Sequence, residues 1–225
     1  PTAPGGGTFV PPWVGALTFR AARPMAAVTS YPRSTERSAR MARRTITPTG
    51  VEKTFHPDQI IVSKTDLQGR LTYVNDLFVE ISGYDEAELV GQPHNVIRHP
   101  SMPRGVFRLL WERISSGEEI FAYVVNLSAD GSHYWVLAHV TPTFDTAGAV
   151  VGYHSNRRTA SPEAITQVTA LYRRLLDEEA RHASAREAVE AGKQALEREL
   201  EAAGASYDEW VWALTNDTDA GRAAA

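Results

Sequence analysis

The sequence GQPHNVIRHPSMP, residues 91–103, lies between two segments with helical patterns. Its three prolines prevent one continuous helix, because each lacks a backbone N–H group and restricts the residue before it. Arg98 and His99 are neighbours within this stiff segment. Such a pair is suited to one wall of a ligand pocket, where it would face an anionic or aromatic group. An ordinary surface loop is the alternative interpretation.

The sequence on both sides of this segment predicts a sheet with helices inserted between its strands. Alternating and β-branched residues predict five strands, at residues 60–65, 70–74, 119–127, 132–143 and 150–158. Helices are predicted at residues 76–82 and 86–90, with a longer one from Pro103 to Gly117. This order predicts an α+β domain, in which short helices cover one face of a five-stranded antiparallel sheet.

The predicted strand at residues 132–143 is apolar on both faces. Tyr134 and Val136 alternate there with Trp135 and Leu137. One face is expected to form the core with the helices. The other face needs a cover, which the segment before Ile60, a C-terminal helix or a second subunit would provide.

Composition divides the chain into four parts. Residues 1–50 are rich in Pro, Gly, Thr and Arg and are predicted to be disordered or extended, with Met41 as a candidate start of the protein. Residues 51–160 hold the α+β domain, and residues 161–215 form an amphipathic helical tail. Heptad-like spacing in the tail fails at Glu179, His182 and Arg186 and is interrupted at Gly192. This predicts two helical blocks, with a hairpin as one arrangement, rather than one continuous coiled coil. Residues 216–225 are predicted to be a disordered end.

Charge and motif content exclude several classes of protein. Residues 1–50 carry seven arginines and one glutamate, a formal charge of +6, whereas the remainder carries 16 basic and 26 acidic residues, a charge of −10. An acidic main body argues against nucleic-acid binding as the main task. The chain has no cysteine, which excludes disulfides, thiolate metal sites and a cysteine–flavin adduct. It has no apolar run long enough to span a membrane, and no phosphate-loop, HExxH or GxSxG motif.

A set of short motifs in residues 60–160 resembles the PAS domain family, and within it the aerotaxis-receptor subtype. The motifs are Asn75-Asp76-x-Phe78, Ser82-Gly83-Tyr84, Glu88-Leu89-x-Gly91-Gln92-Pro93-His94-Asn95, Arg98-His99-Pro100-x-Met102-Pro103, Phe107-x-x-x-Trp111, Asn126, Asp130-Gly131 and Tyr134-Trp135-Val136. The resemblance implies a PAS fold that holds FAD without a covalent bond and senses redox state or oxygen-linked electron flow. We expect a stand-alone, cytoplasmic protein that forms a homodimer and signals to a chemotaxis receptor or another signalling protein, without inserting into a membrane.

Arg98 and His99 match family positions that are needed for FAD. Two positions depart from the family pattern, since Ser101 replaces the usual aspartate and Phe121 replaces a frequent tryptophan. Both changes predict weaker retention of FAD. The candidate cofactor-binding residues are Arg98, His99, Asn126, Trp111, Asn75, His94, Phe121 and Trp135.

A flavin ring needs an apolar slot with a few polar groups at its edge. Candidates for the slot are Trp111, Ile114, Ile120, Ala122, Val124, Val136 and Val140. Asn126 shares a strand face with Val124, so its amide is expected to point at the ring and to exchange hydrogen bonds when the ring is reduced. A turn-forming role at the strand end is the alternative for Asn126.

Two alternatives to a flavin sensor remain open at this point. Haem is the competing cofactor, with His94, His99, His139 or His154 as possible iron ligands. A cofactor-free PAS module for dimerisation or docking is the second alternative. We expect no enzymatic activity, because no catalytic constellation and no metal site can be named.

Overall fold

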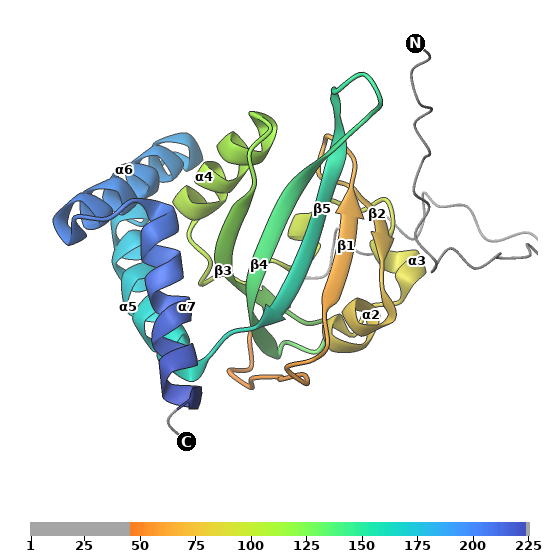
Figure 1. The fold of residues 1–225 in the computed structure, drawn as a ribbon, viewed down its shortest axis with the longest axis horizontal. Coiled ribbons are helices and arrows are strands. Elements are labelled where there is room, and N and C mark those ends of the chain that lie inside the picture. The colour runs from red at the N-terminus through yellow and green to blue at the C-terminus, as the bar shows by residue number, and fades with distance from the viewer. Residues whose placement is uncertain (1–45, 224–225) are drawn as a thin grey trace, which may run out of the picture. The chain divides into compact units, whose positions relative to one another are not determined.

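Five antiparallel strands form one sheet in the order β2-β1-β5-β4-β3 (Figure 1). The structure is a computed structural model that describes residues 46–223, with side chains described as far as Thr215. The strands are β1 Ile61–Thr65, β2 Leu71–Val74, β3 Ile120–Leu127, β4 His133–Phe144 and β5 Val150–Thr159. The predicted α+β fold with a five-stranded antiparallel sheet is therefore confirmed, and each predicted strand lies within one residue of the observed one.

Four short helical segments connect β2 to β3. They are α2 Asp76–Ser82, α3 Glu86–Leu89, the 3-10 helix η1 His94–Ile97 and α4 Arg104–Ser115. The Asn75 side chain accepts the Phe78 N–H at 3.2 Å and so caps the start of α2. Gly83 ends that helix in the left-handed conformation, with φ of +68°, where a glycine is favoured. The proline-rich segment is a 3-10 turn between two loops. It holds no continuous helix, as its three prolines predict.

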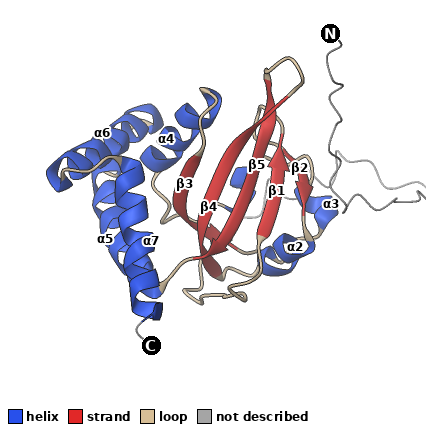
Figure 2. Cartoon of the chain, in the orientation of Figure 1, coloured by secondary structure: helices blue, strands red, loops and turns tan. Residues whose placement is uncertain are grey.

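The C-terminal tail folds into three helices rather than the two predicted. They are α5 Pro162–Glu179, α6 Ala185–Ala203 and α7 Tyr207–Ala223 (Figure 2). The chain breaks between Glu179 and Ser184, which caps α6, in the region where the heptad-like spacing was predicted to fail. It breaks again at Gly204, where φ is +65°. Gly192 lies inside α6 and does not interrupt it, so the predicted break at this residue was wrong. The backbone of α7 is helical to Ala223, beyond residue 215, where the tail was expected to end.

The tail covers the outer face of the sheet at β3 and β4. Tyr172 of α5 packs on Trp135 with ring centroids 6.1 Å apart, and its hydroxyl donates to the Tyr123 carbonyl at 2.6 Å. Trp212 of α7 lies 4.9 Å from Phe121. Because β3 is an edge strand, the hydrogen bond from Tyr172 also gives one of its backbone carbonyls a partner. Of the three covers predicted for this face, the C-terminal helices provide it here.

Helix α4 is held between the sheet and the tail. The buried carboxylate of Glu179, at the end of α5, accepts the Gly105 N–H at 2.8 Å at the start of α4. A carboxylate at the N-terminus of a helix accepts from a free backbone N–H and interacts favourably with the helix dipole. Gly105 and Gly192 bring the backbones of α4 and α6 together, since a Cβ atom on Gly105 would lie 2.5 Å from the Lys193 nitrogen. The tail is therefore packed directly on this helix.

The segment before β1 is also attached to the domain. Thr49 N–H donates to the Gly131 carbonyl at 2.8 Å, and Lys53 N–H donates to the His133 carbonyl at 2.7 Å. These bonds connect it to the turn between β3 and β4. The predicted disorder of residues 1–50 concerns residues outside the described part of the chain, apart from 46–50. Within residues 46–223, no helix is both long enough and apolar enough to cross a lipid bilayer.

Candidate functional site: a cavity between α4, η1 and the sheet

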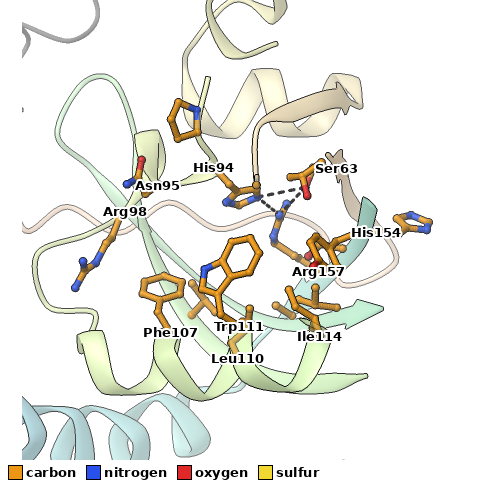
Figure 3. A pocket seen from close by; sticks show the side chains of 18 of the residues that line it. Ser63, His94, Asn95, Arg98, Phe107, Leu110, Trp111, Ile114, His154 and Arg157 are labelled. Atoms are coloured by element: carbon orange, nitrogen blue, oxygen red, sulfur yellow. Dashed lines mark hydrogen bonds between the residues drawn. The ribbon is translucent and has the colours of Figure 1, made fainter. Parts of the chain in front are cut away.

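A cavity of about 290 Å3 lies between α4, η1 and the inner face of the sheet (Figure 3). Its apolar wall comes from Phe107, Leu110, Trp111 and Ile114 of α4 and from Val124, Ala138, Val140 and Tyr153 of the strands. The volume is close to the lower limit of about 300 Å3 for small-molecule sites. A flat ring system can enter such a space, whereas a whole dinucleotide would extend beyond it.

The Trp111 indole lies across this cavity. Its ring meets the Tyr153 ring edge-on, with centroids 5.5 Å apart. Its far edge touches Gly69, in the turn between β1 and β2, where a Cβ atom would lie 2.8 Å from Trp111 Cη2. Gly69 also has a φ of +72°, so both its backbone and this close approach require glycine. Trp111 is thus an aromatic side chain supported on two sides and available to a ring in the cavity.

A polar cluster occupies one end of the cavity and joins three elements. Arg157, on β5, donates through Nη2 to Ser63 Oγ of β1 at 2.7 Å and also to His94 Nε2 of η1. Ser63 Oγ lies 3.3 Å from the same histidine nitrogen. The Phe78 ring of α2 lies 5.3 Å from the guanidinium carbon. These contacts fix the direction of the arginine (Figure 3).

Burial determines the charge of this cluster. It lowers the pKa of His94 to about 3, and the nearby Arg157 cation contributes to the same shift. His94 is therefore neutral at neutral pH, so Nε2 can accept from the arginine. Burial lowers the pKa of Arg157 to about 10, which still leaves the guanidinium charged at neutral pH.

Five buried polar atoms of residues that line the cavity have no hydrogen-bond partner among the described residues. They are Arg98 Nε, Asn126 Nδ2, His154 Nε2, Ser155 Oγ and Arg157 Nη1. The two arginine nitrogens and the Asn126 amide nitrogen are N–H donors, and an unpaired buried donor costs about 1–3 kcal/mol. The pattern fits a ligand with several acceptor atoms on its edge and an apolar body. The pyrimidine side of a flavin ring has this chemistry, so the residues present fit that group.

Four of the predicted site residues meet at this cavity: Arg98, Trp111, Asn126 and His94. A backbone bridge joins Arg98 to Asn126 and ties the end of η1 to β3. The Arg98 guanidinium donates to the Met102 carbonyl at 2.7 Å and lies over the Phe107 ring at 5.2 Å. Figure 3 shows it directed away from the Arg157 cluster, so the two arginines serve different parts of the site.

The other four predicted site residues do not line the cavity. Asn75 uses its amide to cap α2 and to bind β1, accepting from Val62 N–H and donating to the Ile60 carbonyl, both at 2.9 Å. His99 packs on the His133 ring and accepts the Ser101 N–H at 3.1 Å.

Phe121 and Trp135 are on the opposite face of the sheet. Phe121 stacks on His139 at 4.1 Å, and Trp135 packs on Tyr172 of the tail. A direct contact of either ring with a ligand in this cavity is therefore excluded by the strand alternation. The exposed Ser101 does not line the cavity either, so neither departure from the family pattern changes its wall.

The predicted apolar slot is present in part. Trp111, Ile114, Val124 and Val140 line the cavity, whereas Ile120, Ala122 and Val136 are buried in the core beside it. His139 faces away from the cavity, as predicted, and lies 2.8 Å from the Glu119 carboxylate. Within the described residues, no group of three or more histidine or acidic side chains could hold a metal ion.

Ser63 and Arg157 were missed by the sequence prediction. Both lie on strands at positions that point inward, and a period of two from Tyr153 through Ser155 leads to Arg157. An arginine at an inward position of a predicted strand is the signal that would have identified it.

Comparison with known proteins gives the same fold family. Residues 71–157 match the model of the PAS fold. The aerotaxis receptor of Escherichia coli K12 is 43% identical over 118 residues, which are 52% of this chain and 23% of the receptor. A nitrogen fixation regulatory protein of Klebsiella pneumoniae is 26% identical over 102 residues, which are 45% of this chain and 21% of that protein. The chain thus spans less than a quarter of the length of these relatives.

Among solved structures, a light-oxygen-voltage domain studied with a flavin analogue is similar, with a TM-score of 0.44 and 19% identity. The match covers 55% of this chain and 87% of that one.

Proposed function

We propose that the PAS domain of this chain, which is related in sequence to the aerotaxis receptor, binds a flavin, FAD in the first instance, and reports its redox state to a signalling partner. The observation that carries this proposal is the cavity, with one apolar wall and several unpaired buried donors. When bound, the flavin would supply reversible uptake and release of electrons.

The residues of the chain have separate tasks in this proposal. Trp111 and Ile114 would pack on the ring, and Asn126 and Arg157 would donate hydrogen bonds to its edge. The Asn126 amide can present either Nδ2 or Oδ1 to the cavity by rotating, so it can follow a change of protonation in the ring. Arg98, nearer the N-terminus of α4, is the candidate partner for a phosphate or a ring oxygen.

Helix α4 provides the route from the cavity to the tail. One side of it lines the cavity through Leu110 and Trp111, and Gly105 at its start touches α6 and Glu179. A shift of α4 on reduction would therefore change the packing of the tail. We propose that the tail, in a homodimer or with a chemotaxis receptor or similar protein, passes the signal on in the cytoplasm, without catalysis by this chain.

The visible absorption spectrum of the purified protein tests the proposal. A flavin spectrum, before or after refolding in the presence of FAD, is the expected result. A haem spectrum would favour the haem alternative. A protein that stays colourless under both conditions, and whose partner binding is unchanged by Arg98→Ala, would be a docking module instead.

Replacement of Asn126 by leucine tests the contact with the ring edge. We expect FAD affinity to fall about tenfold or more, because one hydrogen bond to the ring is lost. The stability of the flavin-free protein should stay equal or rise, since a buried unpaired amide becomes an apolar side chain of similar size. Flavin fluorescence titration and urea unfolding measure the two effects.

The matched control is Asn156→Leu, on the half-buried side of β5 that faces away from the cavity. It should leave FAD affinity unchanged. Equal affinity of the Asn126→Leu and wild-type proteins would show that Asn126 does not contact the ligand.

A further inference from the structure

Arg157 is a buried cation without an anionic partner. Its side chain is only 3% exposed, and its hydrogen bonds go to a neutral serine and a neutral histidine. Among the described residues, no carboxylate forms an ion pair with it, and Tyr134 is the one side chain whose charge would raise its pKa. Removing a charge from water without a counter-charge is strongly unfavourable. The uncompensated positive charge of Arg157 nevertheless lies at one end of the cavity.

The guanidinium is held so that one edge is left for a ligand. Nη2 is taken by Ser63 and His94, and Phe78 packs against the guanidinium carbon. Nη1 is buried, has no partner among the described residues, and belongs to a side chain that lines the cavity. The free N–H group and the positive charge therefore act at the same place.

The other donors of the cavity do not combine these properties. Asn126 is neutral. Arg98 is half-buried and already donates to the Met102 carbonyl, at a distance from the Arg157 cluster. A ligand atom that carries negative charge has its best partner at Arg157.

We propose that Arg157 receives the carbonyl-rich edge of the flavin and stabilises the negative charge that the ring carries after gaining two electrons and one proton. This inference rests on the proposed function and adds to it the charge state of the reduced cofactor. It follows that the site binds the reduced anion more tightly than the oxidised ring. Arg157 therefore raises the reduction potential of the bound flavin.

The first test compares Arg157→Gln with the control Arg158→Gln, whose residue is the exposed neighbour on β5. Anaerobic reduction with dithionite in the presence of a reference dye gives the potential, and fluorescence titration gives the affinity for oxidised FAD. Arg157→Gln should lower the preference for the reduced form at least tenfold, which is about 30 mV for a two-electron couple. Arg158→Gln should match the wild type, and Arg157→Lys, which keeps the charge, should lie between them.

A second measurement uses the wild type alone, so it does not depend on the folding of a variant. If Arg157 keeps the reduced ring anionic, the potential should change by about 30 mV per pH unit from about pH 6 to about pH 8, as for two electrons and one proton. A change of about 59 mV per pH unit, which corresponds to two protons, would overturn the inference. So would a potential unchanged in Arg157→Gln.

The possible outcomes distinguish the proposed flavin binding from the proposed role of Arg157. A wild-type protein that takes up no flavin contradicts both the proposed function and the role of Arg157. A wild-type flavoprotein whose potential is indifferent to Arg157 retains the proposed function and loses only this inference.

Discussion

Replacing Gly105 by valine is expected to lower the free energy of unfolding by about 3 kcal/mol and to release α6 from α4. The added Cβ atom would lie 2.5 Å from the Lys193 nitrogen and 2.8 Å from the Gly192 carbonyl oxygen. Both are backbone atoms, so the clash cannot be relieved by a side-chain rotation. The helices must separate, which also disturbs the buried hydrogen bond between Glu179 and the Gly105 N–H.

Urea unfolding measures the loss of stability, and hydrogen exchange along α6 measures its release. Arg104→Val is the matched control, because it places the same side chain at the exposed neighbouring position of α4. It should change stability by less than about 0.5 kcal/mol. If Gly105→Val behaves like the control, α6 does not pack on α4 in solution, and the proposed route from cavity to tail is removed with it.

Local sequence signals were sufficient for the sheet and the short helices. Turn glycines, prolines and a period of two predicted every strand, and the helix predicted at residues 76–82 is α2, with the same two ends. The tail was harder. A glycine inside a helix costs up to about 1 kcal/mol relative to alanine, which makes Gly192 resemble a break in the sequence. In the structure, Gly192 leaves room for the Glu179 side chain at the end of α5, since a Cβ atom at this position would lie 2.8 Å from Glu179 Cγ. The two residues lie on different helices, so the sequence around Gly192 does not indicate this contact.

The residues of the candidate site could likewise be predicted only in part from local sequence signals. Strand alternation placed Asn126 in the cavity, and the same alternation places Phe121 behind the sheet, where it stacks on His139. Phe121 was predicted as a site residue from the family resemblance alone, and the strand alternation at this position was not considered. Arg157 was missed because a charged residue near a strand end is usually exposed. Its burial depends on Ser63 and His94, which come from two other elements.

The neutral state of buried His94 is expected to make stability depend on pH below about 6.5. The pKa of His94 is about 3 in the folded protein, because burial and the Arg157 cation both disfavour its charged form, against 6.5 for an unperturbed histidine. As the pH falls from 6.5 towards 3, the unfolded chain takes up a proton at this residue and the folded chain does not. The contribution of neutral His94 is thus fully present above pH 6.5 and is lost as the pH falls. The slope is about 1.4 kcal/mol per pH unit for one such group.

The variant His94→Gln isolates this contribution, since its amide oxygen can still accept from Arg157 but does not titrate. Between about pH 6.5 and about pH 4.5, the wild type should lose roughly 2–3 kcal/mol more unfolding free energy than the variant, measured by urea unfolding at each pH. His56→Gln, which removes an exposed histidine, should follow the wild-type curve. Parallel curves for wild type and His94→Gln would mean that His94 takes up its proton in the folded state. The cluster could then not hold two neighbouring cations without an anion, and Arg157 would have to leave the position on which its proposed role depends.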